Sequence, residues 1–263
     1  MPRALRIGFL NLMPRAETYE PSVRRLLEGR SVPAAMVPVR ALTHAYRSSD
    51  QEHLRRNYVG FDEAMRAGLD GLVVTGAPLG KMEFEEITYW AELEAIFRRC
   101  ASEVPATLGL CWGGVAVGRF LGLRKTLFDR KLFGVFRSRW LAPGHWSADP
   151  AGEEFDCPQS RYASLEQRGL ERAAEEGRLR LLASSAEAGC FVFETADGRF
   201  AAHLGHPEYD AGRILFEYRR DRELGLVPAN FDPAAPLDTW RAASEGFFDR
   251  WLGMVGARAG VLG

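Results

Sequence analysis

The sequence predicts an α/β fold, with a doubly wound, mostly parallel sheet, in a single domain that spans residues 1–263. Short apolar runs of strand length alternate with segments whose apolar residues recur at helical spacing. Several of these runs end in loops rich in glycine, proline or asparagine. Alternation of this kind is typical of strand–helix–strand units, whose strands run parallel beneath helices on both faces of the sheet.

The first half of the chain contains the clearest alternation. Strands are expected at 5–12, 32–39, 69–75 and 106–110, and helices at 21–28, 87–100 and from 112 to about 121. Pro33 and Pro38 each remove a hydrogen-bond donor from the second strand. That segment is therefore expected at the sheet edge, if it forms a strand at all.

The second half predicts further strands at 131–140, 179–183, 190–194 and 200–204, with a hairpin turn at 196–198. The segment 143–158 is polar and loop-like, and helices at 211–224 and 237–255 close the chain. Parallel sheets bind ligands beyond the carboxyl ends of their strands. The loops 11–14, 76–80 and 111–114 are therefore expected to surround the functional site.

The composition excludes several classes of protein. The chain has 34 Lys and Arg against 35 Asp and Glu, a net charge of −1, so no nucleic-acid surface is indicated. No apolar run reaches the roughly 18 residues that span a bilayer, and the apolar start is too short for a signal peptide. We expect a cytoplasmic protein with no membrane partner. Its four cysteines form no Cys-x-x-Cys pair, which argues against a metal site.

Cys111 is the candidate nucleophile. It lies in Gly-Leu-Cys-Trp-Gly at a predicted turn from strand to helix, which matches a nucleophile elbow with cysteine in the serine position. The following helix would direct N–H groups at the thiolate, so Trp112, with Leu79 or Gly80, is the expected source of oxyanion-hole donors. The alternative is a buried structural cysteine, which is the interpretation preferred for Cys100 and Cys190.

His206 is the expected base, because it follows one predicted strand and precedes a helix at the same edge of the sheet. Glu208, two residues later, can orient the imidazole and complete a triad. His203 is expected to point away from the site or into the sheet. The remaining histidines are expected on the solvated surface; they are His44, His53 and His145.

Four motifs in this order resemble the homoserine O-acyltransferases of methionine biosynthesis. They are Asn-Leu-Met-Pro at 11–14, Thr-Gly-Ala-Pro-Leu-Gly at 75–80 with Glu-Phe at 83–84 and Tyr-Trp at 89–90, Cys-Trp at 111–112 and His-Pro-Glu-Tyr-Asp at 206–210. The resemblance implies a class I glutamine amidotransferase-like fold. It also implies that Cys111 forms the acyl-thioester, that His206 accepts the proton and that Glu208 is the third member. Substrate-binding roles are implied for Lys131, Ser160 and Arg220.

The family divides into enzymes that use acetyl-CoA and enzymes that use succinyl-CoA, and the residue after Thr-Gly-Ala-Pro-x follows that division. Glutamate accompanies acetyl and glycine accompanies succinyl, so Gly80 implies succinyl-CoA. The expected activity is therefore succinyl transfer to the hydroxyl of L-homoserine by ping-pong kinetics. The expected partners are small molecules, with succinyl-CoA as co-substrate, and no further cofactor and no metal are expected. A homodimer is one option for the oligomeric state.

Alternatives remain open at this point. The same chemistry could use acetyl-CoA, or serine as the acceptor; the chain could instead be a glutaminase or a non-catalytic binding protein on the same fold. Gly80 could also be only a turn residue. Two departures from the family pattern concern the substrate contacts: the segment 15–20, and Val115, which stands where relatives often have glutamine.

Overall fold

The computed structural model describes residues 3–150 and 152–262. Within them the strands form one ten-stranded sheet in the order β3-β2-β1-β4-β5-β10-β9-β8-β6-β7. The strands are β1 Leu5–Leu10, β2 Ala34–Arg40, β3 Val59–Gly60, β4 Gly71–Val74, β5 Thr107–Leu110, β6 Lys125–Trp140, β7 Glu154–Leu165, β8 Leu179–Ser185, β9 Gly189–Thr195 and β10 Phe200–His203.

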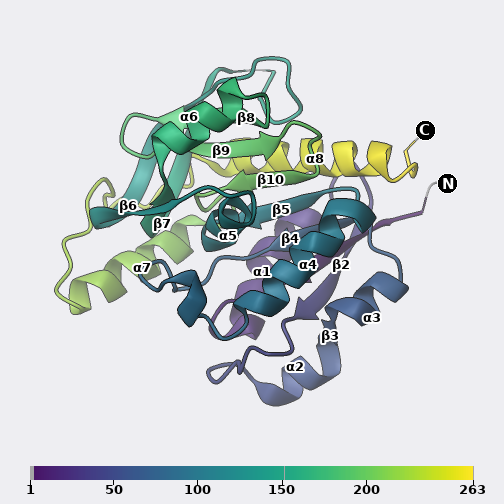
Figure 1. Cartoon of the computed structure of the whole chain (residues 1–263). Helices are drawn as coiled ribbons and strands as arrows, with labels where there is room; N and C mark the ends of the chain where they lie inside the picture. The colour runs from purple at the N-terminus through teal and green to yellow at the C-terminus, as the bar shows by residue number, and fades with distance from the viewer. Residues whose placement is uncertain (1–2, 151, 263) are drawn as a thin grey trace.

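The helices are α1 Ala16–Leu27, α2 Gln51–Asn57, α3 Phe61–Arg66, α4 Trp90–Glu103, α5 Trp112–Phe120, α6 Gln167–Glu175, α7 Ala211–Glu223 and α8 Arg241–Arg258, with a 3-10 turn at Phe84–Glu86. Figure 1 shows α4 and α5 in front of the sheet and α8 behind it. Helices thus cover both faces, as the α/β prediction requires.

The sheet is parallel in one part and antiparallel in the other. The six strands from β3 to β10 pair in parallel, and β9, β8, β6 and β7 continue the sheet in antiparallel pairs. The doubly wound fold class is therefore confirmed, and the predicted hairpin between 190–194 and 200–204 is present as β9 and β10. The antiparallel part carries one side of the site described below.

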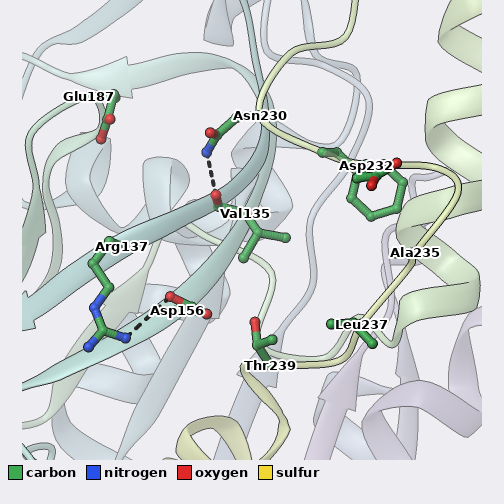
Figure 2. Close-up of a pocket in the computed structure, with 10 residues that line it drawn as sticks. Val135, Arg137, Asp156, Glu187, Asn230, Asp232, Ala235, Leu237 and Thr239 are labelled. Atoms are coloured by element: carbon green, nitrogen blue, oxygen red, sulfur yellow. Dashed lines mark hydrogen bonds and ion pairs between the residues drawn. The ribbon is translucent and has the colours of Figure 1, made fainter.

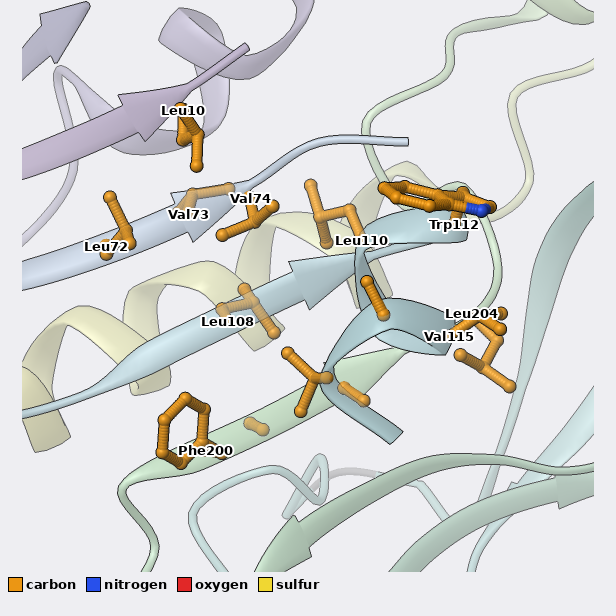
Figure 3. Close-up of a cluster of buried hydrophobic side chains, with 14 of the residues drawn as sticks. Leu10, Leu72, Val73, Val74, Leu108, Leu110, Trp112, Val115, Phe200 and Leu204 are labelled. Carbon is orange, nitrogen blue, oxygen red and sulfur yellow. The ribbon is translucent and has the colours of Figure 1, made fainter. Parts of the chain in front are cut away.

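The strand registers bring the predicted site loops to one edge. Leu10 lies opposite Val74, Val74 opposite Gly109, and Leu110 opposite His203. Since these four strands run in parallel, the residues that follow them emerge at the same end of the sheet. Figure 3 shows buried apolar side chains at that edge, where Leu110 ends β5 and Val115 of α5 lies near Leu204.

Several element boundaries differ from the predictions. Helix α1 begins five residues before the predicted start at 21, because Ala16 N–H donates to the Ser49 hydroxyl and the helix tolerates Pro21. The end of the predicted loop 143–158 belongs to strand β7, which pairs along β6. The last helix begins at Arg241 instead of 237. In the described part of the chain, no helix is both long and apolar enough to cross a membrane.

Candidate active site

Cys111 lies in a strained backbone conformation between β5 and α5. Its φ of 49° and ψ of −115° are unusual for a residue that has a side chain. The Cys111 N–H donates to the His203 carbonyl oxygen at 2.8 Å, which ties the turn to β10. The residue is 8% exposed. This geometry is the strand-to-helix turn expected of a nucleophile elbow.

Three glycines around Cys111 allow the backbone to pack this tightly. A Cβ on Gly109 would lie 2.5 Å from the Gly113 carbonyl oxygen, and one on Gly114 would lie 2.7 Å from Leu204. A Cβ on Gly113 would lie 2.4 Å from the Val74 carbonyl oxygen. The neighbours of Gly109 and Gly113 are backbone atoms, so they cannot move aside without distorting the strands.

We expect Gly113→Ala to reduce the free energy of unfolding by about 1–3 kcal/mol, because the added methyl group overpacks the contact between α5 and β4. Urea denaturation would measure the change. Gly253→Ala is the matched control, since a Cβ there has no heavy atom within 4 Å. It should be neutral or stabilise by roughly 0.5–1 kcal/mol, as expected for alanine in a helix. Equal stability of the two variants would contradict the close-packing argument.

His206 and Glu208 are buried together beside the elbow. His206 Nδ1 lies 2.6 Å from Glu208 Oε1, and the same oxygen accepts from the Tyr19 hydroxyl at 2.5 Å. Burial alone would raise the pKa of Glu208, but His206 and Tyr19 hold it below its ordinary value. Glu208 therefore remains a carboxylate that fixes the imidazole and leaves Nε2 as its free nitrogen.

The free nitrogen of His206 is available to Cys111. Nε2 is buried and makes no hydrogen bond to the described residues. Burial lowers the pKa of His206, but the negative charges of Cys111 and Glu208 outweigh it and raise the pKa well above its usual value. Cys111 and Glu208 therefore both favour the protonated form of the His206 imidazole.

The loop that follows β4 borders the nucleophile. A Cβ on Gly76 would lie 3.7 Å from Cys111 Sγ, so the bare backbone of Gly76 packs against the thiol. Leu79 and Gly80, which are partly buried, lie farther along the same loop. Trp112 packs against Phe84 at 5.9 Å between ring centroids. The Glu-Phe motif at 83–84 therefore supports the residue that begins α5.

Lys131, Ser160 and Arg220 come from three separate elements and meet at two buried carboxylates. Lys131 Nζ lies 2.6 Å from Asp221 Oδ2 and 3.7 Å from Glu217 Oε2. The Ser160 hydroxyl donates to Glu217, and Arg220 Nη2 lies 2.8 Å from Asp221 and 3.3 Å from Glu217. Although burial opposes it, Lys131 and Arg220 lower the pKa of Glu217 to about 2. The three predicted substrate-binding residues thus form one charged cluster.

Tyr209 joins this cluster to the triad. Its ring stacks on His206 with centroids 4.0 Å apart, and its hydroxyl donates to Glu217 at 2.8 Å. The sequence analysis missed Tyr209 and Glu217 as site residues, as well as Tyr19. Tyr209 belongs to the His-Pro-Glu-Tyr-Asp motif at 206–210, so the sequence contained a pattern that could have identified it. No local pattern distinguished Tyr19 or Glu217 from other helix residues.

The predicted surface placement of three other histidines needs correction. His53 and His145 are partly buried, because His53 Nε2 lies 2.7 Å from Glu20 and His145 Nε2 lies 2.8 Å from the buried Glu194. His44 is also partly buried, with its ring 4.1 Å from that of Tyr46. His203 is buried against Phe191 and Phe247, in agreement with a side chain inside the fold. Cys100 and Cys190 are buried as expected.

An open cavity of about 430 Å³ lies elsewhere, between the β6–β7 hairpin and the segment 230–239. Figure 2 shows Arg137 paired with Asp156 on one side and Asn230 bonded to the Val135 carbonyl oxygen on the other. None of the predicted site residues lines this cavity. The cavity therefore lies apart from Cys111, His206 and Glu208.

Comparison with known proteins agrees with this geometry. A family model described as homoserine O-succinyltransferase matches residues 2–260. The chain is 34% identical to a homoserine O-acetyltransferase of Acetivibrio thermocellus, over 95% of this chain and 84% of the relative. It is 35% identical to a homoserine O-succinyltransferase of Photorhabdus laumondii, over 95% of this chain and 83% of the relative.

Solved structures with a similar fold include glutamine amidotransferases. One, from Thermotoga maritima, has a TM-score of 0.62 at 13% identity and covers 98% of this chain and 99% of its own. The glutaminase domain of Trypanosoma brucei CTPS has a TM-score of 0.56 at 15% identity, over 98% of this chain and 94% of its own. The glutamine amidotransferase-like fold expected from the sequence is therefore confirmed, and at this identity the likeness extends to the fold alone.

Proposed function

Because the chain belongs to the homoserine O-succinyltransferase family, we propose that it transfers a succinyl group from succinyl-CoA to the hydroxyl of L-homoserine. The observation that carries the chemistry is the strained Cys111 beside the buried pair of His206 and Glu208. A cysteine nucleophile with an oriented base is suited to acyl transfer through a covalent thioester. A cytoplasmic location, as expected from the sequence, is part of this proposal.

In the first half-reaction the Cys111 thiolate attacks the succinyl-CoA carbonyl and the CoA thiolate departs. One thioester replaces another of similar energy, so the site must supply position and oxyanion stabilisation. Our candidates for the oxyanion donors are the backbone N–H of Trp112 and that of Leu79 or Gly80. Protonated His206 is available to donate its proton to the departing CoA sulfur.

In the second half-reaction the homoserine hydroxyl attacks the acyl-enzyme carbonyl, and the Cys111 thiolate departs. Acylation removes the negative charge of Cys111, which is one of the two charges that raise the pKa of His206. The pKa of His206 then falls, and the neutral imidazole can take the hydroxyl proton. The His206 imidazole thus becomes able to act as a base in the step that removes a proton from the acceptor, while Glu208 keeps the ring oriented.

Lys131, Ser160 and Arg220 are our candidates for binding homoserine, since Tyr209 connects their cluster directly to His206. Arg220 can grip the amino-acid carboxylate with two parallel hydrogen bonds, and its side chain is 40% exposed, so it is accessible to a substrate.

We expect Arg220→Lys to raise the KM for homoserine by about tenfold or more, because a point charge replaces a two-pronged donor. Acylation of Cys111 by succinyl-CoA should be almost unchanged. Steady-state kinetics and single-turnover acylation, followed by mass spectrometry, would separate the two effects. An equal loss in the acylation step would remove Arg220 from the acceptor site.

Gly80 supports the choice of succinyl-CoA. It is not among the glycines with positive φ, so the backbone does not require a glycine there. A Cβ at this position would lie 3.4 Å from the Ala163 Cβ and 3.6 Å from the Tyr162 Cβ, which are ordinary contacts. The glycine at position 80 is therefore better explained by the space that it leaves for an acyl group than by a requirement of the backbone turn.

We expect Gly80→Glu to shift the donor preference toward acetyl-CoA by about tenfold or more, since the added carboxylate fills the acyl site and repels that of succinate. Gly80→Ala is the control: it adds a side chain that fits and has no charge, and it should keep the succinyl preference. Competition between the two CoA donors at equal concentration would measure the ratio. An unchanged ratio in Gly80→Glu would show that position 80 does not select the donor.

The proposed function is tested by incubating the protein with succinyl-CoA or acetyl-CoA and with homoserine or serine, and weighing the products. O-succinylhomoserine should form fastest, with a succinyl mass increase on Cys111 in the absence of acceptor. Faster formation of O-acetylhomoserine would overturn the donor assignment and leave the mechanism intact. Release of ammonia from glutamine without acyl transfer would establish a glutaminase instead.

A further inference from the structure

Arg161 is a buried cation with only neutral partners. It is 4% exposed, and its Nε donates to Gln159 at 2.8 Å, its Nη1 to the Ala163 carbonyl oxygen at 2.9 Å and its Nη2 to the Ala188 carbonyl oxygen at 3.5 Å. It forms no ion pair with any carboxylate of the described residues, 3–150 and 152–262. An unpaired buried charge is costly, and burial lowers the pKa of Arg161 to about 10.

The strand that carries Arg161 runs along the active site. On the N-terminal side of Arg161, the Pro158 carbonyl oxygen accepts from the His206 N–H at 2.9 Å. Farther along the strand, Ala163 packs against Gly80, and the Ala163 carbonyl oxygen accepts a hydrogen bond from Arg161. Arg161 therefore lies on β7 between the residue that bonds the His206 backbone and the residue that packs against Gly80.

The guanidinium retains capacity for an anion. It has five N–H donors, of which three are engaged, and the bond to Ala188 is long. Arginine matches a carboxylate with two parallel hydrogen bonds, and such a pair is strongest where water is excluded. The missing partner of Arg161 is therefore expected to be an anion that enters the site with the substrate.

We propose that Arg161 binds the free carboxylate of the acyl group on Cys111, and so selects donors whose acyl chain ends in a carboxylate. The inference rests on the proposed function, because succinyl has such a carboxylate two methylene groups beyond the thioester carbonyl and acetyl has none. No bond forms or breaks at Arg161. It acts as a specificity residue in the acylation step.

This role also gives a physical reason for the effect expected at position 80. A glutamate there would begin its side chain against Ala163, whose carbonyl oxygen is bonded to Arg161. Its carboxylate could then pair with the guanidinium and take the place of the succinyl carboxylate. Gly80 leaves that place to the substrate.

Arg161→Met tests the inference, because it keeps an apolar chain of similar length and removes the charge. Single-turnover acylation of Cys111 would be followed by mass spectrometry with succinyl-CoA, acetyl-CoA and butyryl-CoA, the last being a longer neutral donor. We expect kcat/KM for succinylation to fall by about 30-fold or more, as for loss of one partner of a buried charge pair. Acetylation and butyrylation should change by less than about threefold, a small effect on the scale of 1.4 kcal/mol per tenfold.

Arg161→Lys provides a second variant, since Arg161→Met also removes three buried hydrogen bonds and could prevent folding. Lysine keeps the charge without the two-pronged geometry, so succinylation should fall less while acetylation stays unchanged. Equal losses with all three donors would overturn the inference. They would indicate that Arg161 acts on Cys111 or stabilises the fold. A wild-type protein that acetylates faster than it succinylates would overturn the proposed donor, a failure distinct from the failure of Arg161 in the variants.

Discussion

Cys111→Ser is expected to lower acyl transfer by about 10⁴-fold, because a hydroxyl is a far weaker nucleophile than a thiolate and the covalent route loses its acceptor. The fold should survive, since the hydroxyl is smaller than the thiol and the elbow backbone depends on the flanking glycines. Product formation from succinyl-CoA and homoserine, measured beside circular dichroism of the folded protein, would show both results.

Cys100→Ala is the matched control for this prediction. Cys100 is also a buried thiol, but it lies on α4 within the core, and burial raises the pKa of its thiol to about 12. Loss of this thiol should leave the turnover unchanged. Normal turnover in Cys111→Ser, or an equal loss in Cys100→Ala, would contradict a covalent mechanism at Cys111.

His206→Asn is expected to reduce turnover by about 10³-fold, since both half-reactions lose proton transfer. Asparagine fills a similar volume but cannot take a proton at neutral pH. Stopped-flow or quenched measurements of CoA release and of product formation would report the two half-reactions separately. His44→Asn is the control, because His44 is partly buried between Tyr46 and Tyr89 and has no contact with the triad.

The pH dependence of His206→Asn gives an independent check. In the wild type, Cys111 and Glu208 raise the pKa of His206, so its imidazole should stay protonated to higher pH than a free imidazole would. In the variant this ionisation is absent, so the pH profile of the residual turnover should lose the step that His206 contributes. Full activity and an unchanged pH profile would show that another group serves as the base.

The arrangement of Cys111, His206 and Glu208 was predictable because its signals are local in the chain. An elbow needs small residues at fixed offsets from the nucleophile, and Gly109 and Gly113 occupy those offsets for a steric reason that the structure makes visible. His206 and Glu208 are two residues apart, so their hydrogen bond follows from one short loop after β10. Parallel pairing of β5 with β10 then brings the two loops together.

The sequence by itself determined the alternation of strands and helices, the elbow at Cys111 and the pairing of His206 with Glu208, since each depends on periodicity or on spacing within a few residues. Only the tertiary structure decided which distant side chains complete the site. Tyr19 is 189 positions from Glu208, and Arg161 has its place because β7 closes the antiparallel part of the sheet along the active-site edge. Such contacts depend on how whole elements pack, and no local pattern in the chain records them.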